Sequence, residues 1–181
     1  MILLTMAALM VAFGNVDISA DRLTAGKPLP PIRGEFLNGK DAVLPEAAAG
    51  KVTLLALGFT YDSRFAVEEW VKKFRESFGK YPAATFYEIP MIGGIARLGK
   101  WFITSGMRKG TPKELHENVV TVYGGTDVWK KRVNFVEPNH AYLLLLDKKG
   151  MVRWVFHGFY VEKDFPPLAA KVEELLNEEL R

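Results

Sequence analysis

The side chain most often used for redox and thiolate chemistry is missing, because none of the 181 residues is a cysteine. This excludes thiol–disulfide exchange, thiol peroxidase activity, disulfide bonds and thiolate metal sites. The remaining candidates for chemistry are an acid, Asp62, the hydroxyl of Ser63 beside it, and the imidazole of His140.

Asp62 and Ser63 follow a turn between an expected strand and an expected helix. The unbroken apolar run Val52–Leu57 is typical of a strand buried on both faces, and Gly58-Phe59-Thr60 ends it. Ser63 is expected to be the helix N-cap, and an ionised Asp62 could cap the turn or lie in solvent. No base near Ser63 in the sequence would activate its hydroxyl, so no catalytic residue is predicted. The N–H groups of the first helical turn could still bind an anion.

The three histidines show no spacing typical of a metal site. Neither His116 nor His157 stands at ligand spacing from His140. Without thiolates, a lone imidazole binds copper(I) poorly, and a single carboxylate at Asp62 is a poor cation site. The sequence therefore predicts no metal and no cofactor, and His140 is expected to be a loop histidine with a local hydrogen bond.

The turn itself resembles a known redox turn. Gly58-Phe59-Thr60, one aromatic residue and then Glu68-Glu69 are similar to the turn of the copper-chaperone redoxins that serve cytochrome oxidase. In those proteins the turn carries two cysteines, and the corresponding positions here hold Asp62 and Ala66. The resemblance implies a thioredoxin-like scaffold from which the redox chemistry has been removed.

The expected order of elements agrees with that scaffold. Asn38-Gly39 indicates a hairpin turn in the Gly- and Pro-rich stretch before the buried strand. The remaining elements are predicted to be a helix to about Gly79, strands at 84–89, 118–123, 141–146 and 152–159, a short helix at 127–133 and a final helix at 163–180. We expect one α/β domain over residues 21–181, with a central mixed sheet flanked by helices and an inserted basic helix.

The inserted helix, expected between Pro90 and Gly110, combines apolar and basic positions. No acid occurs between Glu88 and Glu114, and the basic residues of the expected helix are Arg97, Lys100, Arg108 and Lys109. Ile95, Leu98, Trp101, Phe102, Ile103 and Met107 give it an apolar face. Such a helix is typical of an anionic membrane surface or an acidic partner. The alternative is a crossover helix packed on the sheet with a solvated basic edge.

From about Trp101 to Leu176 the chain resembles the thioredoxin-like assembly factors of the mitochondrial ATP synthase. The hairpin that begins Tyr142-Leu143 and includes Asp147, Arg153-Trp154 and Gly158 carries most of this resemblance, with the basic groups Met107-Arg108-Lys109 and Lys130-Lys131-Arg132. The resemblance implies a non-enzymatic protein that helps a membrane subunit fold or assemble, with Arg132, Arg153 and Trp154 as candidate partner-binding residues. Arg153 could instead pair with an acid or stack on an aromatic ring within the fold. The chain departs from the family pattern after Gly158.

Composition and the N-terminus bear on partners and location. Residues 2–13 are nearly all apolar, so residues 1–20 are predicted to be a signal peptide, or else an apolar N-terminal segment. The chain is expected to be exported or membrane-associated, in a bacterial envelope or periplasm or, in a eukaryote, in mitochondria. A net charge of +3 is too small to indicate nucleic-acid binding.

The favoured function is a non-catalytic thioredoxin-like protein that acts as an assembly or folding factor for a membrane complex, through a protein partner. Two alternatives remain open: a redoxin-type oxidoreductase or metal-handling protein that recruits an external thiol or a metal, and an anion- or ligand-binding module that uses the helix N-terminus at Ser63.

Overall fold

The computed structural model describes residues 21–178, apart from the side chains of Ile95 and Arg97. One mixed sheet runs through it in the order β2-β1-β5-β4-β3-β6-β7. The strands are β1 (Ile32–Phe36), β2 (Asp41–Leu44), β3 (Val52–Gly58), β4 (Ala84–Ile92), β5 (Val120–Tyr123), β6 (Ala141–Leu146) and β7 (Val152–Gly158). The predicted signal peptide at 1–20 lies outside the described residues.

Strands β5, β4 and β3 are parallel, whereas β1–β2 and β6–β7 are antiparallel hairpins added at the two edges. The Asn38-Gly39 turn prediction is confirmed, because Gly39 in the β1–β2 turn has a φ of 90°, which favours glycine. All seven residues of β3 are buried, as expected for a strand covered on both faces.

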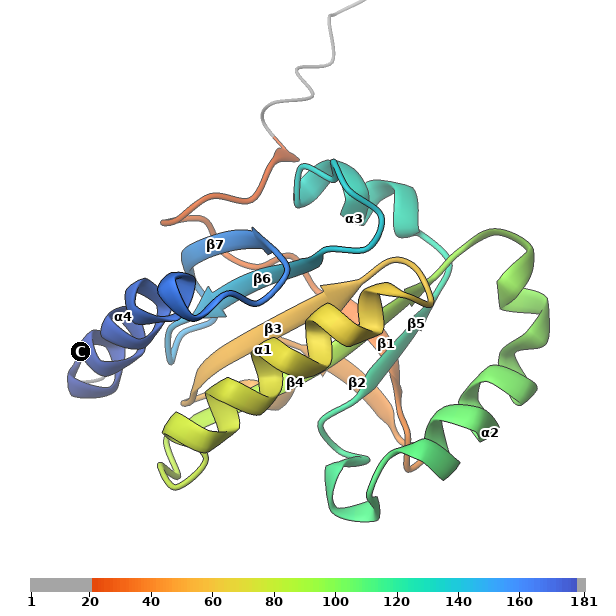
Figure 1. Cartoon of the computed structure of the whole chain (residues 1–181), viewed down its shortest axis with the longest axis horizontal. Coiled ribbons are helices and arrows are strands. Elements are labelled where there is room, and N and C mark those ends of the chain that lie inside the picture. Colours follow the sequence, from red (N-terminus) through yellow and green to blue (C-terminus); the bar gives the residue numbers. More distant parts are fainter. Residues whose placement is uncertain (1–20, 179–181) are drawn as a thin grey trace, which may run out of the picture.

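Helices pack on both faces of this sheet, and Figure 1 shows α1 across the nearer one. On one face, α1 (Ser63–Phe78) and α4 (Phe165–Asn177) enclose a core with Leu54 and Leu143. On the other, α3 (Thr126–Arg132) and the N-terminal segment from Leu23 pack around Leu55 and Tyr142. The predicted thioredoxin-like α/β arrangement is confirmed.

The strand predicted to stop before Pro90 in fact continues to Ile92, so that boundary was wrong. Pro90 forms the last pair of β4 with β3, opposite Gly58, and pairing with β5 begins at the next residue, Met91. The proline, which has no N–H to donate, thus stands between the bridge of Glu88 to Val119 and the β5 pairs that begin at Met91.

The insertion between β4 and β5 contains the 3₁₀ turn η3 (Gly94–Gly99) and helix α2 (Lys100–Gly110). Figure 1 shows α2 beyond the β1–β2 side of the sheet, away from α4. Within residues 21–178, no helix combines the length and apolar composition needed to cross a bilayer.

Candidate functional site

The turn between β3 and α1 is closed by reciprocal hydrogen bonds between Thr60 and Ser63. The Ser63 hydroxyl donates to the Thr60 carbonyl oxygen at 2.7 Å and accepts from the Thr60 amide at 3.2 Å. The Ser63 amide donates to Thr60 Oγ1 at 3.1 Å. Gly58 makes this closure possible, since a Cβ there would come within 2.7 Å of Ser63 Oγ.

One expectation at this turn was wrong, and one of the two alternatives for Asp62 is supported. Ser63 is the first residue of α1 rather than its N-cap, and it is fully buried with its hydroxyl already bonded. Asp62 occupies the N-cap position, but its side chain makes no capping hydrogen bond and is exposed. The buried hydroxyl cannot act as a surface nucleophile, and the Ser63 amide is engaged with Thr60 instead of being open to an anion.

The two positions that correspond to the redox cysteines have different environments. Asp62 is exposed at the start of α1, whereas Ala66, one turn later, is only 1% exposed and packs in the core. A methyl group at position 66 therefore fills part of the core. Nothing at either position can form a bond to sulfur.

Exposed aromatic side chains flank this turn, and sequence reasoning did not single them out. Tyr61 is 74% exposed and Phe65 is 53% exposed. The Arg64 guanidinium lies 3.9 Å from the centroid of the Tyr61 ring and 4.4 Å from that of Phe65. These cation–π contacts hold the two rings at the surface beside Asp62. We call Tyr61, Arg64 and Phe65 the aromatic rim.

The loop before β6 closes the other side of the turn. Thr60 Oγ1 lies 3.0 Å from both the Pro138 carbonyl oxygen and Asn139 Oδ1. The next residue, His140, has its ring against Phe159, which is 52% exposed after the end of β7. The turn, the loop before β6 and the end of β7 therefore meet at one end of the sheet.

The His140 amide makes a local hydrogen bond to the Glu137 carbonyl oxygen at 3.4 Å, but the His140 ring bonds to a residue of β7. Its Nδ1 lies 3.1 Å from Nδ1 of His157 on β7, and the two rings stack at 5.4 Å. At this distance one ring donates and the other accepts, so the pair holds one shared proton between the two nitrogens. Among residues 21–178, no three or more His, Asp or Glu side chains come together as a possible metal site.

The histidine pair should make the stability of the protein sensitive to acid. Burial, the neighbouring His140 and Arg22 together lower the pKa of His157 below its ordinary 6.5, with Glu137 opposing them. Position 157 therefore binds a proton more readily in the unfolded chain than in the folded one. The stability that neutral His157 provides is present above pH 6.5 and is lost as the pH falls below it. Replacing His157 with Gln should weaken the fall of the denaturant midpoint as the pH drops below 6.5. His116→Gln is the control, and an equal effect of both changes would contradict the prediction.

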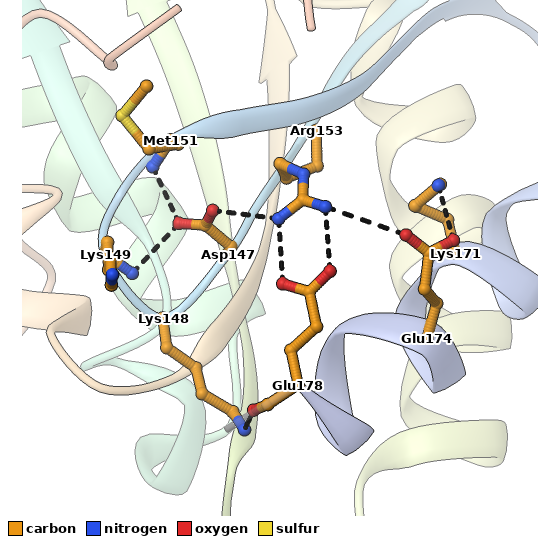
Figure 2. A network of polar contacts seen from close by, with 8 residues as sticks. All are labelled: Asp147, Lys148, Lys149, Met151, Arg153, Lys171, Glu174 and Glu178. Carbon is orange, nitrogen blue, oxygen red and sulfur yellow. Dashed lines mark hydrogen bonds and ion pairs between the residues drawn. The ribbon is translucent and has the colours of Figure 1, made fainter. Parts of the chain in front are cut away.

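Arg153 lies at the centre of a network of ion pairs between the β6–β7 hairpin and the end of α4 (Figure 2). Its guanidinium donates to both carboxylate oxygens of Glu178, at 2.9 and 2.8 Å, and to Asp147 Oδ2 at 3.2 Å. It also lies 3.6 Å from Glu174. Asp147 in turn accepts the amides of Lys149 and Met151, which orders the hairpin turn. Of the two interpretations, pairing with acids inside the fold is the one that the geometry supports.

Replacing Arg153 with Met should lower the free energy of unfolding by about 1 kcal/mol, the upper range for partly exposed ion pairs. The difference from the wild type should shrink as salt is added, because salt screens these charges. Urea unfolding at low and high salt measures both effects, with the exposed Lys80→Met as control. A stability loss that does not change with salt would show that Arg153 acts through packing alone.

The other predicted partner-binding residues also have contacts within the chain. Trp154 is half-buried and stacks on Phe156 at 5.5 Å. Arg132 pairs with Asp21 at 3.2 Å and lies over the Trp129 ring. Both contacts fit a structural role, and a role in partner binding stays a prediction.

On the inserted segment, Lys100 Nζ lies 2.8 Å from Glu35 Oε2 on β1. Arg108 lies 3.8 Å from the same carboxylate and donates to the Leu37 carbonyl oxygen. Lys109 is exposed and makes no ion pair with the described residues. The side chain of Arg97 lies outside the part of the chain that the structure describes.

The fold and the altered turn define the class of this protein: a thioredoxin-like protein whose redox turn has no thiol. The family model described as "ATP10 protein" matches residues 22–175, and the chain belongs to that family. The resemblance to the ATP synthase assembly factors, stated from the hairpin, is thereby confirmed. A search of curated proteins gave no match.

Solved structures similar to this chain include several redoxins. The thioredoxin domain of a thiol-disulfide oxidoreductase from Bacteroides vulgatus has a TM-score of 0.58 at 20% identity, covering 86% of this chain and 99% of that one. BsSco, of the Sco family of cytochrome c oxidase assembly proteins, has 0.59 at 12%, covering 87% and 99%. A peroxiredoxin-like protein from Aquifex aeolicus has 0.54 at 16%, covering 85% and 88%. At these identities the likeness shows the fold alone.

Proposed function

We propose that this protein is a non-catalytic assembly factor for a membrane complex, with the ATP synthase as the favoured complex. The observation that carries the proposal is the redox turn itself, which keeps the strand, the closed turn and the helix but holds Asp62 and Ala66 in place of thiols. Membership of the ATP10 family supports it, since the name of the family model refers to ATP synthase.

The aromatic rim is the surface on which we place the partner, a subunit of the complex. Tyr61 and Phe65 are exposed at the end of the sheet where β3 leads into α1, and Arg64 holds both rings. Exposed aromatic and arginine side chains are the types most enriched among residues that dominate protein interfaces. In this function the scaffold binds an unfolded or unassembled segment without exchanging a disulfide with it. The protein would work at a membrane, in a bacterial envelope or in mitochondria.

Loss and restoration of the complex tests this function. Cells that lack the gene should accumulate less assembled ATP synthase on native gels, and the wild-type gene should restore it. The double variant Tyr61→Ser/Phe65→Ser should fail to restore assembly while keeping the wild-type denaturant midpoint. Val128→Ser, which removes a side chain that is 46% exposed on α3, is the matched control. If the rim variant fully restored assembly, the aromatic rim would not be the surface that binds the partner. If cells without the gene assembled the complex normally, the proposed function would be rejected.

An assay of redox activity separates the proposed function from the redoxin alternative, which predicts turnover. The purified protein should neither consume peroxide nor reduce insulin disulfides above the buffer rate when dithiothreitol is supplied, because it has no cysteine to attack sulfur or oxygen. A thioredoxin run in parallel shows that the assay works. Turnover well above buffer would favour an oxidoreductase that recruits an external thiol.

A further inference from the structure

The outward side of the inserted segment carries a cluster of exposed apolar side chains. Leu98 is 81% exposed, Trp101 72% and Phe102 75%, three of the four highest values among the large hydrophobic residues that the structure describes. The Trp101 and Phe102 rings contact each other edge to face at 4.8 Å. The sequence-based alternative of a helix packed on the sheet is therefore wrong for these residues, and Thr104 is the buried residue of α2.

Contacts between α2 and the sheet hold this cluster outward. Thr104 Oγ1 lies 2.7 Å from the Tyr123 hydroxyl at the end of β5, while Lys100 and Arg108 reach Glu35 on β1. At about 100° per residue, Phe102 and Lys109 lie roughly 140–160° around α2 from Thr104, and Trp101 lies about 60° from it. The helix thus presents to solvent two aromatic rings and Lys109, which forms no ion pair within residues 21–178, while its contacts with Glu35 and Tyr123 fix its position.

The positive charge of the inserted segment indicates which kind of surface the exposed side of α2 would bind. Between Glu88 and Glu114 the chain has five basic residues and no acidic one: Arg97, Lys100, Arg108, Lys109 and Lys113. Glu35 offsets one of these five charges, so the segment stays strongly positive. Exposed Trp, Phe and Leu side chains next to Lys and Arg are typical of helices that lie in the interface of an anionic bilayer. A neutral protein groove would not need this excess of positive charge.

We infer that η3 and α2 form a docking surface for an anionic lipid bilayer, with Leu98, Trp101 and Phe102 entering the interface and Lys109 contacting lipid phosphates. This goes beyond the proposed function, because it concerns the attachment of the domain to the membrane and not the subunit that it assists. The aromatic rim, on the turn between β3 and α1, is a separate surface and remains available for a protein partner.

Co-sedimentation with vesicles tests the inference. The full chain should bind vesicles of phosphatidylcholine with phosphatidylglycerol, and should bind phosphatidylcholine alone at least about tenfold more weakly, because lipid charge supplies part of the attraction. Added salt should weaken the binding. The double variant Trp101→Ser/Phe102→Ser should lose about tenfold or more in affinity, since it removes the buried apolar area. Lys109→Gln should lose about fivefold.

Matched variants separate this surface from general stickiness. Tyr61→Ser/Phe65→Ser removes two exposed aromatics elsewhere, and Lys80→Gln removes an exposed lysine on another face, so both should bind vesicles like the wild type. Binding should also shift the tryptophan emission to the blue, and Trp101→Phe should keep the binding while losing most of that shift. A circular dichroism spectrum and denaturant midpoint equal to the wild type confirm that each variant is folded.

Several outcomes would overturn the inference. The first is a wild-type protein that does not bind anionic vesicles. The second is vesicle binding that Trp101→Ser/Phe102→Ser does not change, as would happen if residues 1–20 bound the membrane. The third is a loss of binding in Tyr61→Ser/Phe65→Ser as large as that in Trp101→Ser/Phe102→Ser. Dimers that depend on Trp101 in the absence of binding to anionic vesicles would instead assign the face to a second copy of the chain. Because assembly of the complex is scored separately, a failure here leaves the proposed function intact, and the reverse also holds.

Discussion

Trp70→Ala should lower the free energy of unfolding by about 3–5 kcal/mol, the range for removing a large aromatic side chain from a core. Trp70 is fully buried in the face of α1 that packs on the sheet. Its ring contacts Phe156 at 5.3 Å and Tyr160 at 5.2 Å, and its Nε1 donates to the Gly158 carbonyl oxygen at 3.2 Å. The side chain therefore joins α1 to the end of β7, and alanine would leave a cavity and remove the hydrogen bond to Gly158.

Denaturant unfolding measures this effect. Trp101→Ala is the matched control, because the same side chain is removed from a position that is 72% exposed. It should change stability by no more than about 0.5 kcal/mol. Trp70→Phe should fall between the two, since it keeps much of the ring packing and loses the hydrogen bond. Equal midpoints for Trp70→Ala and Trp101→Ala would mean that the α1 face contributes little to the core.

The sequence was most informative where local pattern alone decides the structure. The apolar run from Val52 predicts a buried strand because only a central strand can bury every residue, and all seven residues of β3 are buried. The helical spacing of Val67, Trp70 and Phe74 likewise places these side chains in one core. Pro90 misled the strand boundary, because the effect of a missing N–H depends on which strand lies beside it.

The contacts at the candidate site depended on long-range register, which local pattern does not give. The β6–β7 pairing shifts by one residue between Leu145 and Leu146. This irregularity places His157, rather than Phe156, opposite Tyr142, and so brings it to His140. A one-residue shift exchanges the two faces of a strand, so the histidine pair could not be read from spacing.

The ion pairs likewise depend on contacts between residues far apart in the chain. Arg153 meets Glu178 from 25 residues away, and Lys100 meets Glu35 from 65. Sequence showed the basic residues but could not show which were already paired. The sequence also left open whether the apolar side of α2 faces a partner or packs on the sheet, because an apolar stripe at helical spacing normally packs on a core and here Leu98, Trp101 and Phe102 face solvent.

Glu88→Gln should stabilise the protein at alkaline pH by an amount on the order of 3 kcal/mol. Glu88 lies on β4 beside Ala56 of β3, in the interior strands of the sheet. Burial, and to a smaller extent the nearby charge of Glu68, raise the pKa of Glu88 from 4.5 to about 7, and Arg75 only partly offsets them. Because the fold favours the protonated form, the unfolded chain releases this proton at lower pH than the folded chain does. Stability from this group is therefore complete below pH 4.5, falls as the pH rises, and is lost above about 7.

The glutamine variant keeps the shape of the protonated acid and cannot ionise, so the wild type and variant should differ little near pH 4.5, should diverge as the pH rises from 4.5 to about 7, and should keep a constant difference above that. Urea unfolding of both proteins across this range gives the difference directly, and subtraction removes the titration of all other groups. Glu76→Gln, an exposed acid on α1, is the control and should show no such divergence. A Glu88→Gln variant less stable than the wild type at alkaline pH would contradict the prediction. It would mean that the fold stabilises the ionised Glu88 carboxylate. The interior of the sheet beside α1 would then be more polar than the packing around Ala56 and Phe86 indicates.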